Sequence, residues 1–487
     1  MFASFAGVVV ATSGEPVQWI WGGFAAAGYA LAAATAALWR SRGREAALVI
    51  ALVGAVAAPL AWQVTSGGAI PAVGDGSLKV VARSAVLLLR HGTPYLPADQ
   101  ISHVLGYNPY EPAMAIFGLP AAVGLHGGLG SPRLWMGAVA TVAIVAAFRL
   151  SVPGSAVRST AFALGSPVLA LPLTTGLTDL PVLALLGLAL AGTACPQRPR
   201  AHLAGAIALG AACAMKAIAW PALPVFTAIF AARDGGRTAS RFVVTAGLTM
   251  AALVAAMAPA SMTAPAALFQ NTVLFPLGMT RYQTPADSPL PGHLLAITGP
   301  AGHWAAVGLL CAATLALGVS LVVRPPADAL AAAWRLAVSL TVVFVLAPAS
   351  RWGYFVYPAA IVGFMAITRP GHQPQEALPR QENSQVSSRT VAGYHSRVSV
   401  DVLHNDDHLP VLVRPGGSTS RWLRQSFELG PIREPKAAGR ASHRREMSSA
   451  TMSAAACDCR ASAASCPAHI ESASMSPVVP TIGGAGS

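Results

Sequence analysis

Carboxylates are scarce in this sequence, which narrows the search for acid–base chemistry. Only nine acidic residues precede residue 371, in a chain of 487 residues that is 54% hydrophobic and 10% charged. Glu45, Asp234 and Asp328 lie in basic connections, where salt bridging and solubility explain them. If these basic connections face one side of a membrane, acid–base chemistry on the opposite side must draw on histidine or on the remaining six carboxylates. These six are Glu15, Asp75, Asp99, Glu111, Asp179 and Asp287.

Asp75 is the most suggestive of the six because cations follow it at helical spacing. At 100° per residue, Lys79, Arg83 and Arg90 fall within about 40° of one another on a helix over 77–91. The apolar residues of the same helix are expected to face lipid; they are Val80, Val81, Leu87 and Leu88. Two interpretations stay open. Asp75 is a catalytic group beside a cationic stripe, or the helix is an interfacial anchor that Asp75 or Ser77 caps.

Two further cations stand at unusual positions. Lys216 lies near the middle of the apolar stretch 203–232, which we interpret as a hairpin of two short helices. A lysine at membrane depth is costly, so it either serves a function or snorkels to the interface. Arg351 stands in a four-residue connection between two spans. The preference of aromatic residues for the membrane interface explains the nearby Tyr354 and Tyr357, but it does not explain the arginine.

Long apolar segments predict an all-α, multi-pass membrane bundle of about eleven transmembrane helices. The expected spans, besides the two halves of the 203–232 hairpin, are 17–39, 46–62, 134–150, 157–173, 178–195, 241–259, 304–323, 335–348 and 353–368. Arginines cluster in alternate connections, which we therefore place in the cytoplasm. This topology puts 63–133, 174–177, 260–303 and 349–352 outside and requires 112–127 to be interfacial or re-entrant, not spanning.

The chain divides by composition into a membrane domain, 1–370, and a tail, 371–487. The tail is rich in Ser, Ala, Pro, Gly, Arg and His and is expected to be disordered and cytoplasmic. Its Cys457, Cys459, Cys466 and His469 match no zinc-site spacing, so we expect no metal. The net charge of +13 does not indicate nucleic acid, because the arginines gather at the ends of apolar segments.

Six stretches in order resemble the actinobacterial membrane proteins of glycosyltransferase family 87. They are RHGTPYLP (90–97), YNPYEPAMAIFGLP (107–120), TTGLTDLPVLALLG (174–187), MKAIAWPALP (215–224), FQNTVLFPLG (269–278) and PASRWGYFVYP (348–358). The resemblance covers about residues 17–368. It implies a GT-C-like fold, with surface helices beside the membrane, similar to polyprenyl-phosphate-mannose-dependent mannosyltransferases.

The resemblance also implies a reaction and roles for residues. A sugar, mannose in the first instance, would pass from a polyprenyl-phosphate donor to an extracytoplasmic glycan or glycolipid acceptor, without a cofactor. Asp75 would be the base, although GDGS (74–77) places flexible glycines there and leaves Glu111 or Asp179 as alternatives. Lys79, Arg83, Lys216 and Arg351 would share the donor phosphate. Substrate contacts are expected from Tyr107, Tyr110, Glu111, Asp179 and Arg281.

Two other functions fit parts of the sequence. In a transporter or lipid flippase, Lys216 and Asp179 would line a pathway between helices, although the sequence has no clear internal repeat. In a non-catalytic membrane subunit, the fold would be kept without activity. Asp179 itself has a simple alternative role, as the negative charge at a helix N-terminus.

Overall fold

The computed structural model describes residues 1–65, 76–195, 198–263 and 265–368. These residues belong to one unit, Met1–Val386, and those in regular structure are helical, with no strand among them. Asp75 and the tail from 369 onward lie outside the described residues. The prediction of an all-helical membrane domain is thus confirmed for the part described.

The helices follow in chain order, with short 3-10 or π-helical turns labelled η. The first are α1 (Phe2–Thr12), α2 (Pro16–Leu52), η1 (Val53–Ala57), α3 (Ala58–Thr65), α4 (Ser77–His91), η2 (Ala98–Gln100), η3 (Val104–Gly106), η4 (Pro112–Gly118), α5 (Leu119–Ala122) and α6 (Gly127–Gly130). The next are α7 (Pro132–Ser151), η5 (Pro153–Ser155), α8 (Ala156–Gly165), α9 (Pro167–Thr175), α10 (Asp179–Thr193), α11 (Pro199–Met215), η6 (Ala217–Ala219) and α12 (Ala222–Arg233). The last are α13 (Gly236–Met257), η7 (Pro259–Met262), α14 (Ala266–Phe269), η8 (Gln270–Leu274), α15 (Pro291–Ala296), α16 (Pro300–Val323), α17 (Ala329–Leu346), η9 (Trp352–Phe355) and α18 (Val356–Thr368).

Six helical segments of the described chain are long and apolar enough to cross a membrane. They are Pro16–Trp39, Gly43–Gln63, Pro132–Ser151, Gly236–Met257, Pro300–Val323 and Ala329–Leu346. A bent pair, Pro153–Gly165 and Pro167–Thr175, makes a seventh if it counts as one span. The chain is a multi-pass membrane protein. Five further apolar helices are shorter than a full span, including α10 and α18, which is why the predicted eleven exceeds the number that pass by length.

The predicted span 157–173 is not one straight helix. It divides at Ser166 into α8 and α9, which meet at an angle of 65°. Pro167 begins the second helix, and proline disfavours helical backbone at the residue before it. The bend gives α9 a direction of its own, and Ala170 on it packs into the cluster formed by the first two helices.

The N-terminal spans pack closely on each other through glycine. A Cβ atom built on Gly28 would lie 2.6 Å from the Cα of Gly54, so neither position has room for a side chain. The indole N–H of Trp21 donates to the carbonyl of Ala55 at 2.9 Å, inside the π-helical turn η1. The separate predictions of spans 17–39 and 46–62 therefore correspond to two helical segments in contact.

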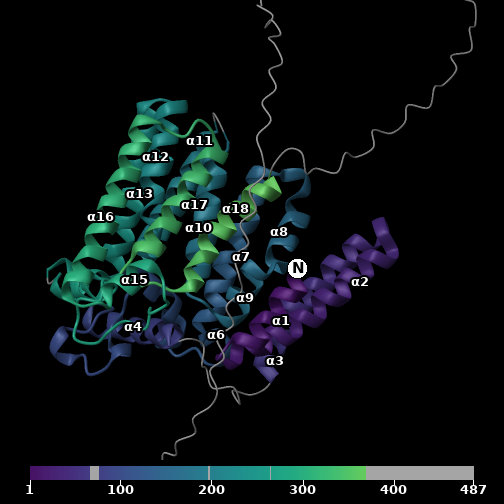
Figure 1. Cartoon of the computed structure of the whole chain (residues 1–487), viewed down its shortest axis with the longest axis horizontal. Coiled ribbons are helices and arrows are strands. Elements are labelled where there is room, and N and C mark those ends of the chain that lie inside the picture. Colours follow the sequence, from purple (N-terminus) through teal and green to yellow (C-terminus); the bar gives the residue numbers. More distant parts are fainter. Residues whose placement is uncertain (66–75, 196–197, 264, 369–487) are drawn as a thin grey trace, which may run out of the picture. The chain divides into compact units, whose positions relative to one another are not determined.

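The main apolar core surrounds α10. This helix contacts α7, α11, α12, α17 and α18 (Figure 1), and most of its side chains are buried. A uniformly apolar helix fits a position enclosed by other helices. Gly192 allows α11 to approach, since a Cβ there would lie 2.8 Å from the Ala201 carbonyl oxygen. The N-terminus of α10, which carries Asp179, is thereby held against the end of α11.

Helix α4 forms over the predicted residues, but its apolar face is not turned to lipid. Val80, Val81 and Leu88 are buried, and the first two belong to the main core. The reason is η4, which packs on α4 so tightly that a Cβ on Gly118 would lie 2.4 Å from the Val81 carbonyl oxygen. The expectation that these three residues face lipid is wrong. The segment Pro112–Ala122 that covers them is too short to span, as the topology requires.

Candidate functional site

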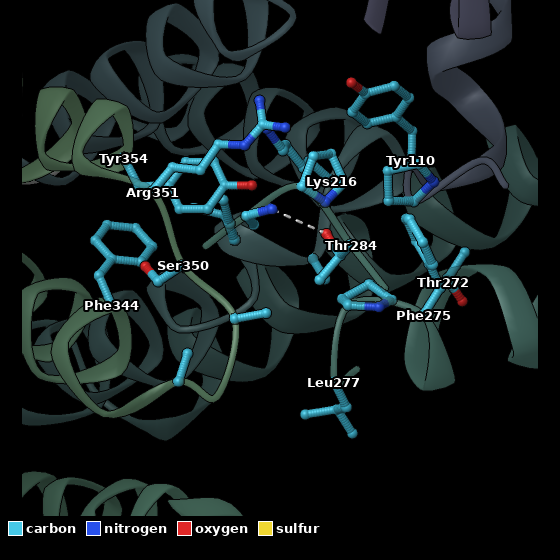
Figure 2. Close-up of a pocket in the computed structure, with 18 of the residues that line it drawn as sticks. Tyr110, Lys216, Thr272, Phe275, Leu277, Thr284, Phe344, Ser350, Arg351 and Tyr354 are labelled. Carbon is cyan, nitrogen blue, oxygen red and sulfur yellow. Dashed lines mark hydrogen bonds between the residues drawn. The ribbon is translucent and has the colours of Figure 1, made fainter. Parts of the chain in front are cut away.

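A cavity of about 600 Å³ collects residues from most of the predicted motifs. It is lined by the start of α4, the loop before η4, the start of α10, the α11–α12 junction, residues 272–277 and 284–286, part of α16, and the end of α17 with the loop that follows. In Figure 2, Arg351, Tyr354 and Ser350 lie on one side of it and Tyr110, Thr272 and Phe275 on the other, with Lys216 between them. The cavity is a meeting point of distant parts of the chain.

An ion pair between Asp179 and Lys216 forms the polar centre of this cavity. The Lys216 ammonium donates to Oδ1 of Asp179. The Asp179 side chain is 13% exposed and the Lys216 side chain 9%. The Tyr357 hydroxyl donates to the same Oδ1 at 2.7 Å. A buried charge is tolerated when it is paired and hydrogen-bonded, and each of these charges is.

Two aromatic rings complete the surroundings of Lys216. Its ammonium lies 5.6 Å from the centre of the Tyr110 ring and 5.2 Å from that of Tyr354. Both distances suit cation–π attraction. Burial opposes a charge on Lys216, whereas the adjacent Asp179 carboxylate and the faces of the two rings favour it. The contacts of Lys216 are thus those of a paired ammonium group.

Local sequence explains why these charges point into a cavity. Gly176 ends α9 in the left-handed region, at φ +76°, which allows the turn before α10 and places Asp179 as its first residue. Lys216 is extended, with ψ 131°, between α11 and η6, where Pro221 precedes α12. The predicted pair of short helices with Lys216 at the break is confirmed.

Each wall of the cavity is held together by contacts between residues that are far apart in sequence. The Tyr107 ring stacks on Phe275 with centres 4.4 Å apart, and the Asn108 N–H donates to Oδ1 of Asn271 at 2.8 Å. On the other wall, the Ser288 N–H donates to the Ser350 carbonyl at 3.1 Å. These contacts fix the lining on both sides of Lys216.

The predicted cations separate into two groups. Lys216 and Arg351 line the cavity, whereas Lys79, Arg83 and Arg281 are not among its lining residues in the described chain. Arg83 donates to the carbonyls of Leu105, Gly106 and Tyr107, the last two at 3.0 and 3.3 Å. Arg83 thus positions a loop, while Lys79 is exposed and the Arg281 guanidinium lies 5.3 Å from the centre of the Tyr282 ring.

The predicted carboxylates also separate. Asp179 lines the cavity, and Tyr107 and Tyr110 line it as well. Asp75 lies outside the described residues, but its neighbour Gly76 is part of the lining. Glu111 is buried at 7% exposure and is absent from the lining that the described residues form. Burial raises the pKa of Glu111 to about 7.

Sequence reasoning missed Tyr357, which it interpreted as a membrane-interface aromatic. The side chain is 0% exposed and its hydroxyl binds Asp179, so that interpretation is wrong. A weak signal existed, because Tyr354 and Tyr357 are three residues apart and such residues share one side of a helix. Nothing in the spacing points to Asp179, which lies in another part of the chain.

Within the described residues, no group of three or more His, Cys, Asp or Glu side chains is placed to hold a metal ion. Comparison of the chain with protein-family models, with curated proteins and with solved structures finds no match.

Proposed function

We propose that the protein is an integral membrane glycosyltransferase. It would transfer a sugar, with mannose as the first to test, from a polyprenyl-phosphate donor to an extracytoplasmic glycan or glycolipid acceptor. One observation carries the proposal: a single cavity combines the Asp179–Lys216 ion pair and Arg351 with an extended apolar lining. A prenyl-phosphate sugar has the same combination of a hydroxyl-rich group, an anion and an apolar chain.

The phosphate is assigned to Lys216 and Arg351. Fixed cations that face a leaving phosphate stabilise the charge that develops on it. Lys216 has three N–H donors, and one donates to Asp179. Its remaining donors have no hydrogen-bond partner among the described residues, and we assign them to phosphate oxygens. Because Lys79 and Arg83 stand outside the lining, we do not assign them to the phosphate; Arg83 instead keeps the loop of Tyr107 in place.

The apolar lining suits a prenyl chain. It includes Val343 and Phe344 of α17 and Leu310 of α16. Leu310 is ten residues beyond the start of α16, or roughly 15 Å along the helix. The lining thus includes residues of two helices that are long enough to span a membrane, which is where a lipid chain would lie.

The proposed reaction needs a base for the acceptor hydroxyl. The family resemblance assigns this role to Asp75, next to Gly76 in the cavity lining. The acceptor oxygen forms a bond to the anomeric carbon, and the bond from that carbon to the phosphate oxygen breaks, its electron pair leaving with polyprenyl phosphate. The hydroxyl proton passes to the base.

The assay is sugar transfer by the purified protein in lipid vesicles. The donor is radiolabelled polyprenyl-phosphate mannose, and the acceptors are crude envelope lipids and glycans. We expect transfer, and we expect Arg351→Gln to reduce it at least tenfold while Arg281→Gln, outside the cavity, leaves it unchanged. Movement of the donor across the bilayer without transfer would overturn the proposal in favour of a flippase. If the protein neither transfers the sugar nor moves the donor across the bilayer, the result would favour a non-catalytic subunit.

A further inference from the structure

The Asp179 carboxylate is held by one oxygen only. Lys216 and Tyr357 both donate to Oδ1, and within the described residues Oδ2 has no hydrogen-bond partner. Asp179 is also the only carboxylate among the described residues that line the cavity. Its side chain is 13% exposed, so the group is not sealed from that space. This is the arrangement of an oriented carboxylate with one oxygen left for a substrate.

We propose that Asp179 is the catalytic base of the transfer reaction, acting through Oδ2, and that Tyr357 is its positioning residue. The inference rests on the proposed function and names the residue that receives the proton. It assigns to Asp179 the role that the family resemblance gives to Asp75, a residue outside the described part of the chain.

Tyr357 suits the positioning role because it is neutral, buried and rigidly placed. Its ring packs near Phe344, with ring centres 6.3 Å apart, and its hydroxyl lies 2.7 Å from Oδ1. Two donors on one oxygen restrict rotation of the carboxylate, so the other oxygen keeps one direction. A base is effective only within hydrogen-bonding reach of the proton it takes.

Lys216 links the base to the leaving group. One N–H donates to Oδ1, and the remaining donors can reach a phosphate in the same cavity. In the transfer step, the acceptor oxygen bonds to the anomeric carbon as the carbon–phosphate-oxygen bond breaks. The proton of the acceptor hydroxyl goes to Oδ2, and the electron pair of the broken bond goes to the lipid phosphate. Asp179 thus loses its negative charge as negative charge develops on the phosphate, and Lys216 would contact both groups.

The test compares Asp179→Asn, Tyr357→Phe and Asp75→Asn in the vesicle assay, with mannosyl farnesyl phosphate as the donor. We expect Asp179→Asn to lower kcat on the order of 100-fold or more, the usual size of a lost general base. We expect Tyr357→Phe to lower kcat about tenfold while the donor KM changes less than twofold, since its hydroxyl acts on the base alone. Asp287 is an exposed carboxylate that is not among the lining residues, so the kcat of Asp287→Asn should match that of wild type.

Asp179→Asn leaves Lys216 without its counter-charge, so Asp179→Glu covers the case in which the first variant does not fold. It keeps the negative charge but moves the oxygens by about one bond length, and a displacement of this size costs up to roughly 100-fold in rate. A kcat within threefold of wild type in a folded Asp179 variant would overturn the assignment, and loss of transfer in Asp75→Asn at the same time would return the role to Asp75 and keep the proposed function. Absence of transfer by wild type would overturn both.

Discussion

Tyr357 donates a hydrogen bond of 2.7 Å to Asp179, a residue 178 positions away in the sequence. The bond joins the start of α10 to α18, two helices that are far apart in sequence but in contact in space. The same carboxylate oxygen pairs with Lys216 at the end of α11. Three helices are therefore held together at one atom.

Removing the lysine should cost more stability than removing the tyrosine hydroxyl. Lys216→Met leaves Asp179 buried without a counter-charge, and breaking a buried pair in this way costs about 3–5 kcal/mol. Tyr357→Phe removes one hydrogen bond to a charged group, at about 1.5–3 kcal/mol. The midpoint of thermal unfolding in detergent should rank wild type above Tyr357→Phe and Tyr357→Phe above Lys216→Met. Equal midpoints would show that the ion pair does not hold the three helices.

Stability should depend on the protonation of Glu111. Burial raises the pKa of this carboxyl from 4.5 to about 7, so the folded protein holds the proton more tightly than the unfolded chain. Protonation of Glu111 therefore contributes up to about 3 kcal/mol to the free energy of unfolding. This contribution is fully present below about pH 4.5, falls as the pH rises toward about 7, and is absent above that value.

Glu111→Gln provides the comparison for this pH dependence, because it keeps the shape of the side chain and cannot ionise. In the variant, stability should lack the part of the decline between pH 5 and 8 that Glu111 causes. Its midpoint of unfolding should therefore exceed that of wild type at pH 8. Two curves that run parallel over this range would show that Glu111 is not the group responsible.

Two glycines of α10 should respond in opposite ways to alanine. In Gly192→Ala the new Cβ would lie 2.8 Å from the Ala201 carbonyl oxygen, and overpacking of this kind costs about 1–3 kcal/mol. In Gly187→Ala the new Cβ meets nothing within 4 Å, so the variant should be neutral or gain about 0.5–1 kcal/mol from better helix propensity. Urea titration in detergent measures both, and equal effects would contradict the close approach of α10 and α11.

Arg83 should order the loop that carries Tyr107. Its guanidinium donates to three successive carbonyls, from Leu105 to Tyr107. Arg83→Gln should increase amide hydrogen exchange over residues 104–107, since the loop loses these contacts. Lys79→Gln, one turn earlier on the same helix and exposed, is the matched control and should leave the exchange as in wild type. Unchanged exchange in Arg83→Gln would mean that other contacts hold the loop.

The orientation predicted from the arginines is open to a direct test. The connections that carry Arg149 with Arg158, and Arg233 with Arg237, should face the cytoplasm, and the 371–487 tail should lie on the same side. Protease added to sealed right-side-out membrane preparations should leave an epitope at residue 487 intact and remove it after permeabilisation. Removal before permeabilisation would reverse the topology and place the cavity on the cytoplasmic side.

Local sequence was sufficient for the elements and for some positions in the site. The predicted helix 77–91 is α4, and the break predicted around Lys216 lies between α11 and α12. Both follow from interactions within a few residues: helical periodicity in the first case, and in the second a stretch too long for one short helix with proline near its middle. Lys216, Arg351 and Asp179 could be selected by type alone, because charge in an apolar chain needs a reason.

Only the tertiary structure decided which face of α4 is covered and which atoms Asp179 meets. Val80 and Val81 have the same periodicity whether lipid or η4 covers them, so no pattern within α4 separates the two environments. Tyr357 likewise resembles an interface aromatic until α18 packs against the start of α10. Helix formation depends on neighbours in sequence, whereas pairing of buried polar groups depends on how separate helices pack, and that packing brings Lys216 and Tyr357 to one oxygen of Asp179.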